Sequence, residues 1–334
     1  MMYRGLISGK KKDRKKKGDK AMENLINKVI EALEMRLGEG YTIIPKDKRK
    51  NNGLILHGIC ICREGDSISP VIYPEKFDQD CSMGNPDPEK VADSILKIYS
   101  ESTPNIIPLN ISDYLKNFIM IKEKIRIKLI NHAANIGELE NIPHRKFLDL
   151  AVIYYLDMEP LITGHSASAI ITNELMEIWG VTEDDLYMIG MEKLLSEDGG
   201  SITDMPSILR EIMQEEPSTM TESAIDEIEK DRNGLEMYVA SNRKRLFGAN
   251  CLMNVFLLHG LAESTGCSLI IFPSSIHELV IIPQKNGSED CMSTEDIQQI
   301  NVTQVLKEEW LSNSIYRYDR AKREVSIYKE GAPL

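Results

Sequence analysis

The sequence lacks any apolar run of the length, about 20 residues, that a membrane-spanning helix requires. No apolar segment follows its basic N-terminal run, so we expect no secretory signal. Aromatic residues are few, at 6%, whereas hydrophobic residues make up 42%, which is typical of a globular chain. We therefore predict a cytoplasmic protein of about two domains.

The sequence motifs of several common enzyme classes are also missing. We find no G-x-S-x-G, no H-E-x-x-H, and neither of the glycine-rich phosphate-binding patterns. Of the six cysteines, only Cys60 and Cys62 are close together, and no second pair completes a zinc-binding set. We predict no metal and no cofactor, and we interpret the cysteines as packed thiols in a reducing compartment.

Charge is unevenly distributed along the chain. The net charge is −12, but the stretch Lys10–Lys20 carries +6, which leaves −18 on the remainder. We predict a disordered basic tail at 1–20, whose arm could contact nucleic acid or an acidic partner. This basic arm consists of Lys10, Lys11, Lys12, Arg14, Lys15, Lys16 and Lys17. An acidic remainder argues against a broad nucleic-acid surface, because cations supply most non-specific affinity for phosphate.

Helical and strand patterns are interspersed without regular β-α-β alternation, which favours an α+β fold with mixed, largely antiparallel sheets and packed helices. We expect an α+β region at 21–140 and another at 141–330, the latter with a mobile acidic excursion at 197–236. The longest predicted helix is Ile111–Ala134, and Phe147–Leu156 is a predicted central strand. Asp149 lies within that strand, where a buried carboxylate would need a partner.

The stretch Gly266–Pro283 is predicted to be a hairpin, with two apolar runs on either side of a short polar turn. The turn holds the candidate catalytic residues Ser274, Ser275, His277 and Glu278. A serine nucleophile needs a base within hydrogen-bond reach and a carboxylate that orients the base. Strand alternation would place Ser275 and His277 on one face and Glu278 on the other. A structural turn, with serines bonded to the local backbone, is the alternative.

Other polar residues lie beside predicted strand ends. The binding candidates are His144, Arg145, Arg243 and Arg245, because arginine matches carboxylates and phosphates through its planar fork. The same arginines could instead pair with the acidic remainder of the chain. If His277, Glu278, Asp149, His144 and Arg145 met in one pocket, an enzyme would be favoured.

Five segments carry a resemblance to a known family. They are PHRKFLDLAVIYYL, AIITNELMEIWGVTEDDLY, NRKRLFGANCLM, IIFPSSIHELVIIP and INVTQVLKEEWLSNSIYRYDR. Over roughly residues 20–330 the chain resembles an uncharacterised bacterial family built on a domain of unknown function. The resemblance implies one family-wide architecture and a bacterial cytosolic origin, and it assigns no catalytic residue.

Taken together, these patterns favour a non-catalytic protein-binding or accessory module. A serine-type hydrolase that uses Ser274 or Ser275 with His277 is the first alternative. Contact with nucleic acid through the basic arm is the second.

Overall fold

The computed structural model describes ten stretches of the chain: residues 22–64, 71–73, 87–102, 111–158, 168–196, 199–215, 221, 236–273, 275–285 and 292–334. The predicted tail at 1–20, its basic arm and Ser274 lie outside them. The described helices include none that is long and apolar enough to span a bilayer. The chain divides into two compact units, and the second comprises residues 51–53, 112–160 and 167–334. The region boundary predicted near residue 140 falls inside this second unit.

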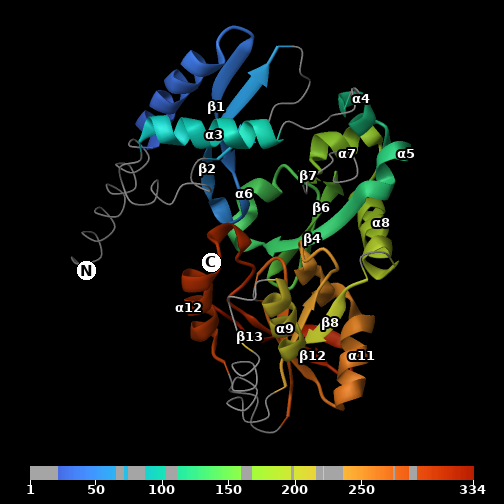
Figure 1. Ribbon diagram of the computed structural model, residues 1–334. Helices are drawn as coiled ribbons and strands as arrows, with labels where there is room; N and C mark the ends of the chain where they lie inside the picture. The colour runs from blue at the N-terminus through green and yellow to red at the C-terminus, as the bar shows by residue number, and fades with distance from the viewer. Residues whose placement is uncertain are drawn as a thin grey trace, which may run out of the picture. The chain divides into compact units, whose positions relative to one another are not determined.

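The first unit is a small sheet covered by helices. β1 (Tyr41–Arg49), β2 (Ile55–Arg63) and β3 (Val71–Ile72) form an antiparallel sheet with β2 in the middle. A helix at 22–37 and α3 (Pro88–Ser102) pack on one face of it (Figure 1). The core lies between them and includes Leu33, Ile59, Ile61 and Ile95.

The second unit begins with short helices rather than a long one. The predicted helix Ile111–Ala134 is wrong: the segment forms α4 (Ile111–Lys116), α5 (Phe118–Ile121) and then β4 (Ile125–Asn131). The strand forms because Ile125, Ile127 and Leu129 recur every second residue, and all three are buried. Ile125 and Leu129 also continue the helical spacing of three and four residues that begins in the preceding segment, but the alternation of buried residues in the strand decides the structure.

The central strand of the first sheet in this unit is β6 (Leu150–Asp157). It pairs with β4 on one side, and with β5 (His144–Phe147) and β7 (Ser168–Ile170) on the other. The predicted strand Phe147–Leu156 is thus corrected to a tight β5–β6 hairpin. Leu148, with φ of +58°, and Asp149 make its turn. The helix α8 (Glu183–Ser196) packs on this sheet, where Gly190 lies directly against Ile127.

The other sheet has six strands in the order β13-β12-β10-β11-β9-β8, and all its pairs are antiparallel. The strands are β8 (Ser201–Asp204), β9 (Tyr238–Ser241), β10 (Leu269–Phe272), β11 (Leu279–Pro283), β12 (Ile315–Asp319) and β13 (Glu324–Lys329). The predicted hairpin at Gly266–Pro283 is confirmed as β10–β11, and β12–β13 forms a second hairpin. With three antiparallel sheets and packed helices, the α+β prediction is confirmed as well.

Helices cover both faces of this six-stranded sheet (Figure 1). On one face, Ile297 of α12 (Thr294–Gln304) packs against Ile270 and Phe272. On the other, His259 of α11 (Val255–Thr265) contacts the ring of Tyr318, which pairs with Leu269. The predicted acidic excursion contributes structure here, because β8 and α9 (Met205–Glu215) lie within it.

A buried group of asparagines was not expected from the sequence. Asn52 donates to the carbonyls of Lys307 and Trp310, at 2.9 and 2.8 Å. Its own side-chain oxygen accepts from Asn135, whose amide also reaches the carbonyl of Asn131 at 2.7 Å. The amide of Asn52 therefore satisfies two carbonyls of the 305–310 segment, which contains Glu309.

Candidate functional site

The turn between β10 and β11 is held by its own polar groups. Ser275 is only 8% exposed, and its hydroxyl accepts the backbone N–H of His277 at 3.0 Å. Its backbone N–H donates to the carbonyl of Glu278 at 3.3 Å. The hydroxyl of Ser275 therefore closes the turn, as in other serine turns.

His277 has both ring nitrogens directed at neighbours other than Ser275. Its Nδ1 accepts the backbone N–H of Phe247 at 3.1 Å, which places the ring proton of the neutral form on Nε2. Nε2 lies 3.6 Å from a carboxylate oxygen of Glu309. Burial lowers the pKa of His277 and Lys128 lowers it further, against the opposing effect of Glu309 and Glu278. The folded protein thus favours the neutral ring.

This geometry bears directly on the serine hydrolase alternative. A triad directs one histidine nitrogen at the serine and the other at a carboxylate. Here a backbone amide occupies Nδ1, and Nε2 faces Glu309, so neither nitrogen serves the hydroxyl of Ser275. A pairing of Ser274 with His277 stays a prediction.

Aromatic rings and a lysine surround the turn. The ring of Phe247 stacks on that of His277 with centroids 5.6 Å apart. The ring of Tyr155 meets the ring of Phe247 edge-on, with centroids 5.1 Å apart. The ammonium of Lys128 lies 3.9 Å from the centroid of Phe247, within cation–π range. The backbone of Phe247 has a φ of +58°, in the left-handed region that bulky residues rarely adopt. The bond to His277 helps to hold it there.

Two of the three predicted binding arginines make ion pairs. Arg145 bonds to Glu183 at 2.7 Å and also contacts Asp184, while its guanidinium lies 4.0 Å from the centroid of the Tyr187 ring. Those carboxylates hold the pKa of Arg145 above its usual value. Arg245 pairs with Glu211, and Arg243 is exposed.

The remaining candidates, His144 and Asp149, have partners of their own. The Nδ1–H of His144 donates to the carbonyl of Ile142 at 3.0 Å. Asp149 accepts three hydroxyl bonds, from Ser312 at 2.6 Å, Ser314 at 3.0 Å and Tyr316 at 2.8 Å. Asp149 thus has the partners that were expected, although it lies half-buried in the β5–β6 turn and not within a strand.

The five polar residues whose meeting in one pocket would favour an enzyme do not all come together. His277 and Glu278 share the turn before β11, His144 and Arg145 are neighbours on β5, and Asp149 lies in the β5–β6 turn. His277 belongs with Phe247 and Glu309, Arg145 with the start of α8, and Asp149 with β12. Among the described residues, we find no hydrogen bond or ion pair that joins these groups.

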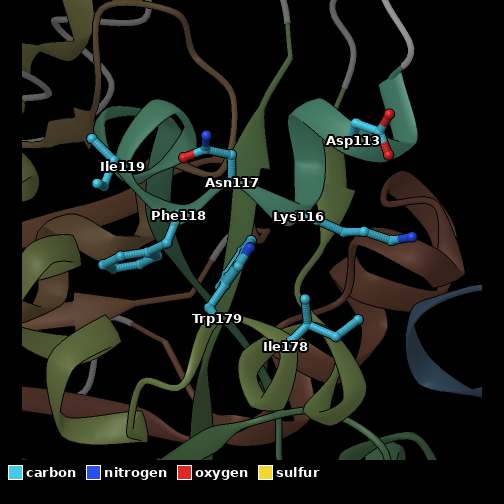
Figure 2. Close-up of a pocket in the computed structure, with 7 residues that line it drawn as sticks. All are labelled: Asp113, Lys116, Asn117, Phe118, Ile119, Ile178 and Trp179. Carbon is cyan, nitrogen blue, oxygen red and sulfur yellow. The ribbon is translucent and has the colours of Figure 1, made fainter.

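A concave site lies elsewhere, at α4, α5 and α7 (Asn173–Trp179), with a volume of about 450 Å³. It is lined by Asp113, Lys116, Asn117, Phe118, Ile119, Ile178 and Trp179. We call it the Trp179 pocket. Figure 2 shows the rings of Phe118 and Trp179 close together, with Lys116 and Ile178 on one side of them and Ile119 on the other.

Local structure fixes the aromatic floor of the Trp179 pocket. The indole N–H of Trp179 donates to the carbonyl of Leu115 at 2.7 Å, and its ring centroid lies 5.6 Å from that of Phe118. Trp179 is the last residue of α7, which Thr172 caps at its start and the left-handed Gly180 ends. The floor is therefore formed before any ligand arrives.

The sequence reasoning missed this pocket. Phe118 falls within the predicted helix Ile111–Ala134, and no sequence pattern places its ring beside that of Trp179. One available signal was the pair of consecutive apolar residues at the end of α7, Ile178-Trp179, since one helix face cannot bury both.

The model of the DUF5688 family, described as a family of unknown function, matches residues 22–320. No curated protein and no solved structure matches the chain.

Proposed function

The chain belongs to the DUF5688 family, and from this premise we propose that it is a non-catalytic protein-binding module with the Trp179 pocket as its contact site. One observation carries the proposal: apolar side chains stand exposed around a preformed aromatic hollow. Ile119 is 79% exposed and Ile178 is 48% exposed, and both line the pocket. Met120, the next residue on α5, is also exposed.

Scattered apolar residues on a surface need no explanation, but a concave cluster of them does. Aromatic residues and methionine are enriched at the centres of protein interfaces, where charged residues are depleted. The Trp179 pocket shares the aromatic part of this pattern through Phe118 and Trp179, while Asp113 and Lys116 add two charges to its lining. A floor held by a hydrogen bond also lowers the entropic cost of binding.

The proposed partner presents one bulky apolar side chain to this hollow, for example from an amphipathic helix. Lys116 is exposed beside the pocket and suits an acidic residue next to the anchor. We place this contact in the bacterial cytosol as part of the proposal, because the six cysteines show no spacing typical of a disulfide-rich secreted domain.

The test compares the wild type with Ile178→Lys and with Val302→Lys as bait for proteins from a lysate of the source organism. Val302 is a matched control, because it is 61% exposed on α12, outside the pocket. We expect a stoichiometric partner that the wild type and the Val302 variant retain and that the Ile178 variant loses. Equal retention by all three proteins, or no partner for any of them, would refute the proposal.

A fluorescence titration then locates the contact. The chain has two tryptophans, so Trp310→Phe leaves Trp179 as the sole tryptophan reporter. Partner binding should shift the Trp179 emission to shorter wavelengths as the pocket loses water. Binding without a change in that emission would place the contact elsewhere. Sedimentation equilibrium of the chain alone distinguishes a second copy from a foreign partner.

The basic arm remains a proposal for a separate contact with nucleic acid. Deletion of residues 10–17 should abolish salt-sensitive retention on DNA or RNA, because each phosphate contact releases counterions.

A further inference from the structure

Two cysteine side chains lie side by side on the middle strand of the first unit. Cys60 and Cys62 are two residues apart on β2, so they share one face of the sheet. Their Sγ atoms are 3.6 Å apart. The intervening Ile61 points the opposite way, into the core beneath the helices. We propose that Cys60 and Cys62 are a thiol-oxidation site, at which a low-molecular-weight disulfide such as glutathione disulfide converts them into a reversible intrastrand disulfide.

The two thiols differ in access, and this difference assigns their roles. Cys60 is 6% exposed, whereas Cys62 is partly exposed near the end of β2. Burial is the largest cause that raises the pKa of Cys60, to about 11, followed by its contact with Cys62. Since the thiolate is the attacking species, Cys62 reacts first and Cys60 second.

The exchange proceeds in two balanced steps. The thiolate of Cys62 attacks one sulfur of the small disulfide, forming a mixed disulfide and releasing one small thiol after protonation. Cys60 then loses its proton and attacks the sulfur of Cys62, which expels the second small thiol. Two protein thiols and one small disulfide become one protein disulfide and two small thiols. The small disulfide is the oxidant and is itself reduced.

Strand geometry makes the product easy to reduce. Residues two apart on a strand are separated by about 6.6 Å along it, which is near the upper limit of the Cα separations that disulfides span. Closing the bond therefore strains β2, and strained disulfides are the labile, regulatory ones. The strain acts beside β3, a strand of two residues that pairs with β2 through Cys60 and Ile59.

Peptide mapping tests the assignment on the full chain. Trypsin cleavage after Lys50 and Arg63 releases one peptide, residues 51–63, that contains both cysteines and no other. The protein is incubated with glutathione disulfide, alkylated and digested. We expect this peptide to be lighter than its reduced form by two hydrogen atoms, to resist alkylation, and to regain both thiols with dithiothreitol.

Single variants separate the two roles. Cys60→Ser should stop at the mixed disulfide on Cys62, because the second thiol is missing. Cys62→Ser should react at least about tenfold more slowly, because a buried thiol of high pKa supplies little thiolate. Cys267→Ser, which alters a partly exposed cysteine on another segment, should behave as the wild type. Circular dichroism confirms that each variant is folded.

Two outcomes would overturn the proposal. One is that the 51–63 peptide of the wild type, treated with glutathione disulfide under conditions in which Cys60→Ser forms its mixed disulfide, shows no intrastrand disulfide. The peptide would then either stay fully alkylatable or keep the glutathione. The other is a Cys62→Ser variant that reacts as fast as Cys60→Ser.

Discussion

Replacing Asp149 by asparagine should destabilise the second unit while preserving the shape of the side chain. One carboxylate oxygen accepts the hydroxyls of Ser312 and Ser314, and the other accepts that of Tyr316. The three donors are at most 3% exposed, so none has water as an alternative partner. The asparagine amide accepts through one oxygen only, so its nitrogen deprives either Tyr316 or both serines of an acceptor. At about 1–2 kcal/mol for each orphaned donor, we expect a loss of about 1–4 kcal/mol.

Urea unfolding followed by tryptophan fluorescence measures this loss, because Trp179 and Trp310 both lie in the second unit. Asp184→Asn is the control: its carboxylate is 84% exposed in a surface ion pair, and its loss should cost less than about 1 kcal/mol. Tyr316→Phe should lower the free energy of unfolding more in the wild type than in the Asp149→Asn variant. The reason is that the bond from the Tyr316 hydroxyl is charge-assisted only when residue 149 is a carboxylate. Equal losses for the Asp149 and Asp184 variants would refute the reasoning.

Two further predictions concern the turn at His277. Burial lowers the pKa of His277 below 6.5 in the folded protein, so as the pH falls the unfolded chain binds the proton before the folded one does. The stability that His277 contributes is therefore complete above pH 6.5 and is lost as the pH falls below 6.5. His277→Asn, which still offers an acceptor to Phe247, should flatten the decline in unfolding free energy between about pH 7.5 and about pH 5.5; an unchanged slope would contradict this. Gly248→Ala should lower the free energy of unfolding by more than about 2 kcal/mol, because the added Cβ would lie 2.6 Å from the carbonyl oxygen of His277. Gly260→Ala is the control: it has open space around it and should be neutral or stabilising. Equal urea midpoints for the two variants would exclude the clash.

The parts of the fold that the sequence predicts well are those in which neighbouring residues decide the structure. The β10–β11 hairpin follows from two short apolar runs around a polar break, and every residue that it needs lies within Gly266–Pro283. The failure at 111–134 has the same origin. Ile125 and Leu129 fit a helical spacing, while Ile125, Ile127 and Leu129 fit a strand, and only the pairing with β6 decides between them.

The candidate site was less predictable because its contacts cross long stretches of chain. A partner for Asp149 was expected, but Ser312 and Tyr316 follow it by more than 160 residues. The Trp179 pocket likewise needs Phe118, about 60 residues earlier, to come against the end of α7. No local periodicity carries that information, because tertiary packing brings these residues together.

The turn that drew attention in the sequence has most of its described polar groups engaged in structure. The Ser275 hydroxyl accepts from the backbone, and His277 uses Nδ1 for Phe247 and its carbonyl for the hydroxyl of Ser241. The N–H of Ile276 donates to the carbonyl of Glu309. A catalytic turn must keep its acid–base groups directed at a substrate, whereas these bonds join the turn to the segments at 241–247 and 305–310. The residues that resemble a triad therefore connect segments of the fold. Burial favours the neutral form of His277, and its accepting nitrogen bonds to the backbone of Phe247, which has a left-handed conformation.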